Sequence, residues 1–186
     1  MEVKRNQVLT IPNLMSLLRL CLIPVFVSLY LEGKNAATAA VLLLSGLTDV
    51  ADGWFARRFG AVSDLGKALD PVADKLTQAA MLMCLVTRYP AMLVPFMLLM
   101  AKELFAAVSG LLVIRYTGSV PGAVWHGKVT TLLLYGLMIL HVIWKEIPIS
   151  LSNILIGLCV AMMILSLVLY AIRNISAIQH ARREGH

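Results

Sequence analysis

Six long apolar stretches, separated by short polar segments, set the predicted architecture of the chain. They cover residues 11–30, 36–54, 67–87, 91–116, 128–144 and 149–170. Each has about the length, roughly 20 residues, that an α-helix needs to cross the hydrocarbon core of a bilayer. The strict alternation of apolar and polar positions that is typical of transmembrane strands is absent. The pattern therefore predicts an all-α polytopic membrane protein with six transmembrane helices.

The polar opening of the chain, residues 1–10, contains Lys4 and Arg5. We expect it to lie along the membrane surface as a short interfacial segment. A cleavable signal peptide is not expected, because the first apolar stretch outruns a signal core and carries Arg19 in its interior. No linker divides the chain, so residues 1–186 are expected to form one membrane domain.

Composition agrees with a membrane location. The chain is 60% hydrophobic and 14% charged, and its mean hydropathy is +0.85, whereas about a quarter of the residues of a soluble domain are charged. The net charge of +6 does not indicate nucleic acid, because basic residues in such a protein gather in cytoplasmic loops and against anionic lipid. Three cysteines lie in apolar stretches and are interpreted as buried small hydrophobic residues: Cys21, Cys84 and Cys159.

The basic residues also predict an orientation in the membrane. Six spans place both termini on one side, and the loops and tails of that side hold ten Lys or Arg residues. The loops of the other side hold three, namely Lys34, Arg88 and Lys145. By the positive-inside rule, both termini and the loop between the second and third stretches face the cytoplasm.

Four aspartates are the main candidates for chemistry. They form two pairs, Asp49 with Asp52 and Asp70 with Asp74, which flank a loop expected over residues 55–66. Spacings of three and four residues put each pair on one face of a helix. Ionisable groups at the edge of a membrane span are costly and indicate function. Because four gathered carboxylates repel one another, they predict a divalent cation, and oxygen ligands favour Mg²⁺, Mn²⁺ or Ca²⁺.

The residues between the two pairs suit a phosphorylated substrate. Gly53, Ala56 and Gly66 are small enough to let a ligand approach the backbone. Arg57 keeps its charge, and its planar guanidinium group matches a phosphate. The segment therefore predicts a phosphorylated substrate that is chelated by metal.

These residues together resemble the signature of the CDP-alcohol phosphatidyltransferases, D-x2-D-G-x2-A-R-x8-G-x3-D-x3-D, with all eight positions present. The resemblance implies that Asp49, Asp52 and Asp70 hold metal, expected to be two Mg²⁺ or Mn²⁺ ions. It implies that Asp74 is the catalytic base and also contacts a metal. The residues that it assigns to CDP binding are Asp52, Gly53, Ala56, Arg57 and Gly66.

Two longer runs of sequence indicate which members of the family the chain resembles most. The runs TIPNLMSLLRLCLIP and LGKALDPVADK are most similar to phosphatidylglycerophosphate synthases and the related cardiolipin synthases. This implies transfer of a phosphatidyl group from CDP-diacylglycerol to sn-glycerol 3-phosphate, with release of CMP. The alternative is a cardiolipin synthase that uses phosphatidylglycerol, and the run after Gly127 departs from the GK-x-K-T pattern of the first group at Thr130. Members of the family often form homodimers, so a homodimer in membrane lipid is expected.

Basic residues in or near the apolar stretches are candidates for contacting the acceptor's phosphate: Lys102, Lys128, Arg115 and Arg19. Arg19 has the alternative of extending its guanidinium group to the membrane interface. Lys102 is not expected to pair with Glu103, because neighbouring residues do not share a helix face.

Three other side chains receive structural interpretations. Lys75 is interpreted as a charge partner of the aspartates, His126 as a solvated loop residue, and His141 as a packed or hydrogen-bonded residue.

Two other classes of protein are alternatives to the enzyme. A metal-ion transporter would hold its acids near the bilayer midplane and not at one face, and a lipid-binding scaffold gives no reason for a complete motif.

Overall fold

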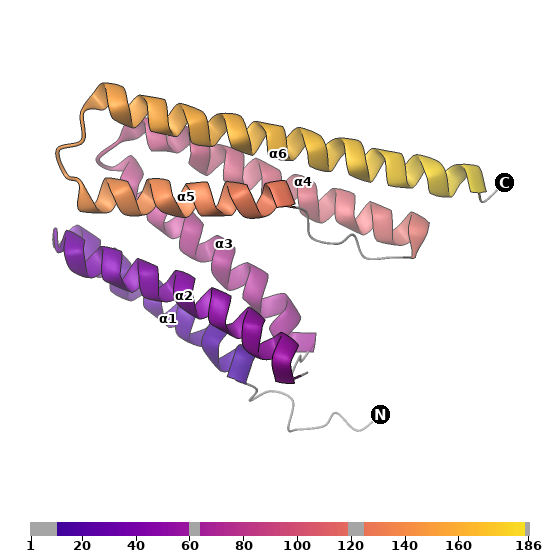
Figure 1. Ribbon diagram of the computed structural model, residues 1–186, viewed down its shortest axis with the longest axis horizontal. Helices are drawn as coiled ribbons and strands as arrows, with labels where there is room; N and C mark the ends of the chain where they lie inside the picture. The colour runs from indigo at the N-terminus through magenta and orange to yellow at the C-terminus, as the bar shows by residue number, and fades with distance from the viewer. Residues whose placement is uncertain (1–10, 60–63, 119–124, 185–186) are drawn as a thin grey trace. The chain divides into compact units, whose positions relative to one another are not determined.

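The computed structural model describes residues 11–59, 64–118 and 125–184, and these residues form helices without any strand (Figure 1). The elements are α1 (Ile11–Leu31), α2 (Asn35–Phe59), α3 (Asp64–Val86), the short 3₁₀ helix η2 (Pro90–Met92), α4 (Leu93–Thr117), α5 (Trp125–Ile143) and α6 (Ile149–Glu184). The all-α prediction is confirmed. The interfacial segment predicted for residues 1–10 lies outside the described residues.

Four of the described helices are long and apolar enough to cross a membrane. Their apolar spans are Leu14–Leu31, Pro90–Thr117, Trp125–Ile143 and Ile149–Ala181. The part of α2 that precedes the motif, Asn35–Thr48, is a shorter apolar helix. The motif itself, apart from Asp74, lies outside the residues on which these spans are based.

The surface of the helices also fits a lipid environment. Leu111, Leu132 and Ile149 are 68%, 73% and 79% exposed. Apolar side chains exposed in this number would form large patches on a soluble monomer, whereas lipid tails cover them without cost. The chain is therefore a polytopic membrane protein.

Three predicted helix ends were wrong. α2 continues to Phe59 through Arg57, which was expected in a loop. α5 begins at Trp125, so His126 is helical. α6 runs to Glu184, well beyond the end expected at residue 170. Hydropathy marks where a helix leaves the hydrocarbon, but the polar residues that follow are good helix formers and extend its hydrogen bonding.

The helices group into two compact units. Unit 1 comprises Met1–Arg88 with Met138–Glu146, and unit 2 comprises Tyr89–Leu137 with Ile147–His186. In unit 1, α1 packs against α2 and α3, and Phe26 and Leu42 are fully buried. In unit 2, α4 packs against α6. A single domain over residues 1–186 remains a prediction.

Hydrogen bonds tie together the turns at one end of unit 1. Asn35 Nδ2 donates to the Val142 carbonyl, and Arg88 Nη2 donates to the Lys145 carbonyl. Lys145 Nζ donates to the Gly33 carbonyl at 3.1 Å. These contacts lie at the start of α2 and the end of α3. The acidic motif occupies the end of α2 and the start of α3, so it lies at the opposite ends of the same two helices.

Candidate active site

The eight-position motif lies on the adjoining ends of two consecutive helices. Asp49 and Asp52 are on the C-terminal half of α2, and Asp70 and Asp74 are on the N-terminal half of α3. Both pairs therefore have helical spacing, as the sequence predicted. The side chains of residues 49–59 and 64–70 lie outside the described residues. The convergence of the four carboxylates, and the CDP contacts assigned to the small residues and Arg57, stay predictions.

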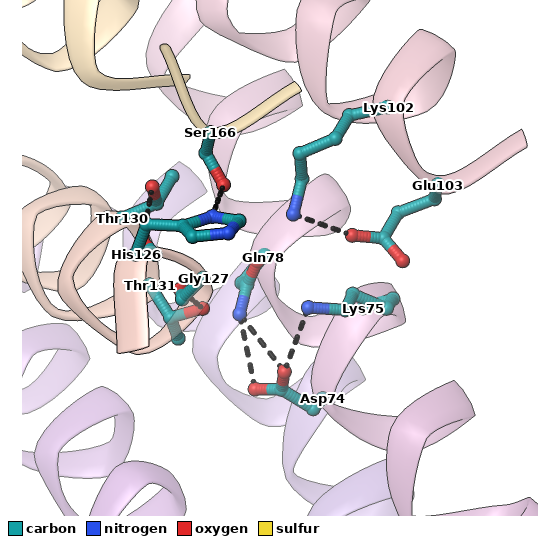
Figure 2. Close-up of polar contacts among 10 residues, drawn as sticks. All are labelled: Asp74, Lys75, Gln78, Lys102, Glu103, His126, Gly127, Thr130, Thr131 and Ser166. Atoms are coloured by element: carbon teal, nitrogen blue, oxygen red, sulfur yellow. Dashed lines mark hydrogen bonds and ion pairs between the residues drawn. The ribbon is translucent and has the colours of Figure 1, made fainter. Parts of the chain in front are cut away.

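Asp74 is the member of the motif whose side chain the structure describes, and donors on its own helix hold it. Gln78 Nε2 lies 3.1 Å from Oδ1 and 3.0 Å from Oδ2 of Asp74 (Figure 2). Lys75 Nζ lies 3.3 Å from Oδ2, which confirms Lys75 as a charge partner of the motif. The Asp74 side chain is 14% exposed, so its carboxylate is shielded from solvent over most of its surface.

The donor chemistry of the motif suits a hard divalent cation. Carboxylate oxygens are the ligands that Mg²⁺ and Mn²⁺ prefer, and Asp74 contributes one carboxylate. Within residues 11–59, 64–118 and 125–184, the described side chains form no group of three or more His, Cys, Asp or Glu that could hold a metal. The side chains of three of the four predicted ligands, Asp49, Asp52 and Asp70, are not among those described. The donor set fits the metal, and metal binding remains a prediction.

Lys102 is buried on α4 and forms an ion pair with its neighbour. It is 6% exposed, and its Nζ lies 2.9 Å from Glu103 Oε1 (Figure 2). The expectation that these two residues would not pair was wrong. Neighbouring residues point about 100° apart around a helix, but the flexible four-carbon stem of lysine can curve back to an adjacent carboxylate. A buried charge in an apolar helix gains much from such a partner.

His126 is buried in the first turn of α5, so its assignment to a solvated loop was wrong. The side chain is 5% exposed, and Nδ1 lies 2.9 Å from Ser166 Oγ on α6 (Figure 2). Its ring meets Tyr170 and Trp125 edge-on, with ring centroids 4.8 and 5.9 Å away. The prediction failed because the helix begins before the residues that resemble the family's glycine-lysine run.

Further polar contacts join the helices of unit 2. Asn174 Nδ2 on α6 donates to Ser109 Oγ on α4 at 2.8 Å. Within α6, Arg173 stacks over Tyr170, 5.1 Å from the ring centroid. A β-carbon on Gly127 would lie 3.0 Å from Tyr170 Oη, so α5 and α6 touch closely there. Sequence reasoning missed this polar face of α6, although its members recur at helical spacing: Ser166, Tyr170, Arg173 and Asn174.

The contact between His126 and Ser166 predicts a measurable coupling between α5 and α6. Hydrogen bonds between membrane helices are worth about 0.6 kcal/mol on average and at most about 1.7 kcal/mol. In a double-mutant cycle of His126→Phe and Ser166→Ala, we expect a coupling energy of about 0.5 to 1.5 kcal/mol. Unfolding in mixed detergent micelles measures it. Ser176 is exposed on α6, so Ser176→Ala gives the control cycle, and a coupling no larger than in that control would contradict the contact.

The remaining candidates are dispersed over both units. Arg19 is completely buried in α1, so protein covers its side chain, and the alternative that its guanidinium group extends to the interface stays a prediction. Arg115 and Lys128 are exposed on α4 and α5. For these three residues and Lys102, contact with an acceptor stays a prediction. His141 is buried, as expected.

The cysteine prediction is confirmed in part. Cys84 and Cys159 are buried, whereas Cys21 is exposed. The apolar pattern does not distinguish the two faces of a membrane helix, because the face that meets lipid is as apolar as the face that meets protein.

Known proteins resemble the chain over most of its length. The model of the CDP-alcohol phosphatidyltransferase family matches residues 9–172. A CDP-diacylglycerol–glycerol-3-phosphate 3-phosphatidyltransferase of Aquifex aeolicus is 30% identical over 176 residues, which is 91% of this chain and 98% of the relative. A cardiolipin synthase (CMP-forming) of Streptomyces coelicolor is 35% identical over 136 residues, 70% of this chain and 63% of the relative.

A third relative is larger than this chain. A cardiolipin synthase (CMP-forming)/mitochondrial hydrolase fusion protein of Schizosaccharomyces pombe is 34% identical over 112 residues, 60% of this chain and 19% of the relative. The chain thus spans less than two thirds of the length of both cardiolipin synthase relatives and nearly the whole length of the Aquifex relative.

Proposed function

The chain belongs to the CDP-alcohol phosphatidyltransferase family, and on this premise we propose that it transfers the phosphatidyl group of CDP-diacylglycerol to sn-glycerol 3-phosphate. The products are CMP and phosphatidylglycerophosphate. The observation that carries this choice of acceptor is the near full-length likeness to a relative named as a CDP-diacylglycerol–glycerol-3-phosphate 3-phosphatidyltransferase. The complete eight-position motif supports the reaction type.

In the proposed mechanism, Asp74 is the general base. It takes the proton of the acceptor hydroxyl, whose oxygen bonds to the phosphorus that carries diacylglycerol. The bond from that phosphorus to the CMP phosphate breaks, and CMP leaves with the electron pair. The hydrogen bonds from Gln78 and the ion pair with Lys75 support this role, because they place an amide donor and a positive charge beside the carboxylate.

The other members of the motif bind and orient the nucleotide. Asp49, Asp52 and Asp70 would hold two Mg²⁺ or Mn²⁺ ions, with Asp74 as a further contact. Bound metal would neutralise the pyrophosphate and stabilise the leaving phosphate. The small residues of the motif admit the CDP close to the helix backbone, and Arg57 offers a bidentate donor to a phosphate.

The acceptor is proposed to bind through its phosphate to basic side chains, for which Lys102, Lys128, Arg115 and Arg19 are the candidates. Their charge suits glycerol 3-phosphate and also the phosphodiester of phosphatidylglycerol. A cardiolipin synthase is therefore the second candidate. It is favoured by the relatives of that name and by Thr130, which stands where the first group carries a lysine.

We further propose that the site and both termini face the cytoplasm and that the protein is a homodimer. The excess of basic residues in the loops on the side of the acidic motif supports the orientation. A cytoplasmic site would meet water-soluble glycerol 3-phosphate directly, while the acyl chains of CDP-diacylglycerol remain in the bilayer.

CMP release tests the proposal. The purified protein in detergent receives CDP-diacylglycerol and Mg²⁺ or Mn²⁺, with glycerol 3-phosphate, phosphatidylglycerol, serine, inositol or inositol phosphate added separately. We expect release with glycerol 3-phosphate alone. Release with phosphatidylglycerol alone would make the protein a cardiolipin synthase, and no CMP release with any of these acceptors would refute the proposed transfer reaction.

A further inference from the structure

Gln78 stands out as a polar residue in the interior of α3 that contacts the proposed base. It lies one helical turn after Asp74, and its side chain is 1% exposed. Its Nε2 reaches both carboxylate oxygens, at 3.1 Å and 3.0 Å (Figure 2). The amide nitrogen must face Asp74, because the opposite arrangement would set the amide oxygen against the carboxylate.

Stability alone gives no reason for a glutamine at this position. A buried amide is costly unless it is hydrogen-bonded, and a pair of this kind at i, i+4 stabilises a helix only weakly. An apolar side chain of the same length would fill the space without that cost. The contact is therefore better explained by what it does to Asp74.

We propose that Gln78 is a positioning residue for the transfer reaction, which holds the Asp74 carboxylate in the orientation that accepts the acceptor's proton. The proposal rests on the function proposed above. The terminal torsion of an aspartate has a broad minimum, so an unheld carboxylate rotates. A donor that reaches both oxygens restricts that rotation. Because the amide is neutral, it orients the carboxylate without adding a cation that would compete with bound metal.

Lys75 cannot supply the same restraint. Its Nζ lies 3.3 Å from Asp74 Oδ2, and its side chain is 28% exposed against 14% for Asp74. An ammonium group on a flexible stem attracts the carboxylate but does not fix its plane. Loss of Gln78 should therefore leave the charge balance of Asp74 intact and change its orientation.

We expect loss of Gln78 to lower kcat while leaving KM nearly unchanged. Misplacing a reacting group by about 1 Å can cost about 10²-fold in rate, so Gln78→Met should lower kcat by about 10- to 100-fold. KM for CDP-diacylglycerol and for the acceptor should stay within about twofold, because Asp49, Asp52 and Asp70 remain as the proposed metal ligands and Asp74 is only a further contact. Gln78→His, which keeps an N–H donor, should recover part of the lost kcat.

Thr77 provides a matched control on the same helix. It is fully buried, and its Oγ1 donates to the Ala73 carbonyl of α3 at 2.9 Å and not to Asp74. Thr77→Val removes a buried donor of similar depth without touching the carboxylate. We expect near wild-type kcat from this variant.

The experiment measures CMP release by wild type, Gln78→Met, Gln78→His and Thr77→Val, together with Mn²⁺-dependent CDP binding by calorimetry and thermal unfolding in detergent. Positioning predicts that Gln78→Met binds CDP with Mn²⁺ as wild type does, unfolds at a similar temperature and loses kcat. An unchanged kcat in Gln78→Met would overturn the proposal. So would equal losses in Gln78→Met and Thr77→Val, or a fall in kcat that follows lost CDP binding or lower stability. If the wild-type protein released no CMP with any acceptor, that result would instead refute the proposed function, and the positioning role with it.

Discussion

Asp74→Asn is expected to lower CMP release by about 10²- to 10⁴-fold, which is the usual contribution of a general base. Asparagine has the size of aspartate, but its amide does not take a proton from the acceptor hydroxyl. The side chain lies on α3 within reach of Gln78 and Lys75, and the substitution replaces one carboxylate oxygen with an NH2 group that cannot accept a hydrogen bond from either residue. The rate of CMP release from CDP-diacylglycerol, measured with the acceptor that wild type uses, tests this prediction.

Two further measurements make the Asp74 prediction specific. Asp64, the first residue of α3, lies outside the eight-position motif, so Asp64→Asn removes a carboxylate from the same helix and should leave turnover near that of wild type. Binding of CDP with Mn²⁺ should survive in Asp74→Asn within several-fold, because the other three aspartates remain. An Asp74→Asn protein that keeps more than roughly a tenth of wild-type turnover would contradict its role as base.

Removal of divalent metal is expected to reduce CMP release by at least about 10²-fold, since metal contributes several kcal/mol of charge stabilisation to such a transition state. Four aspartates and a pyrophosphate would otherwise bring like charges together. Mg²⁺ or Mn²⁺ should restore activity after treatment with EDTA. Zn²⁺ should not, because it prefers nitrogen and sulfur ligands that the motif lacks.

The metal prediction needs a control for the chelator itself. EDTA that has been saturated with Mg²⁺ before it is added should leave turnover unchanged at the same ionic strength. If metal-free protein released CMP at the wild-type rate, the assignment of Asp49, Asp52 and Asp70 as metal ligands would be wrong.

The sequence predicted most of the helices, because spanning a bilayer requires an uninterrupted apolar length that is a local property of the chain. It failed where a helix leaves the hydrocarbon. α2 reaches Phe59 and α6 reaches Glu184 because backbone hydrogen bonding continues where hydropathy falls. The same cause placed His126 in a loop, although it lies in the first turn of α5.

Within the candidate site, the sequence predicted the charged residues but not the neutral residue that donates hydrogen bonds to one of them. Asp74 and Lys75 drew attention because ionisable groups are rare near membrane spans, and their pairing was expected and is present. Gln78 has no charge and no place in the family signature, so only its distance to Asp74 reveals it. The pairing of Lys102 with Glu103 depends on side-chain rotamers, which residue spacing alone does not specify.

The hydrogen bonds that join the turns at one end of unit 1 have a consequence for synthesis of the protein. Lys145 donates to a carbonyl that lies 112 residues earlier in the chain, and Asn35 donates to Val142 across 107 residues. At about 5 to 20 residues per second, a ribosome needs roughly 6 to 22 s to make the intervening chain. During that interval α1, α2 and α3 rely on their own packing, and this end of the unit closes only after the fifth helix has emerged.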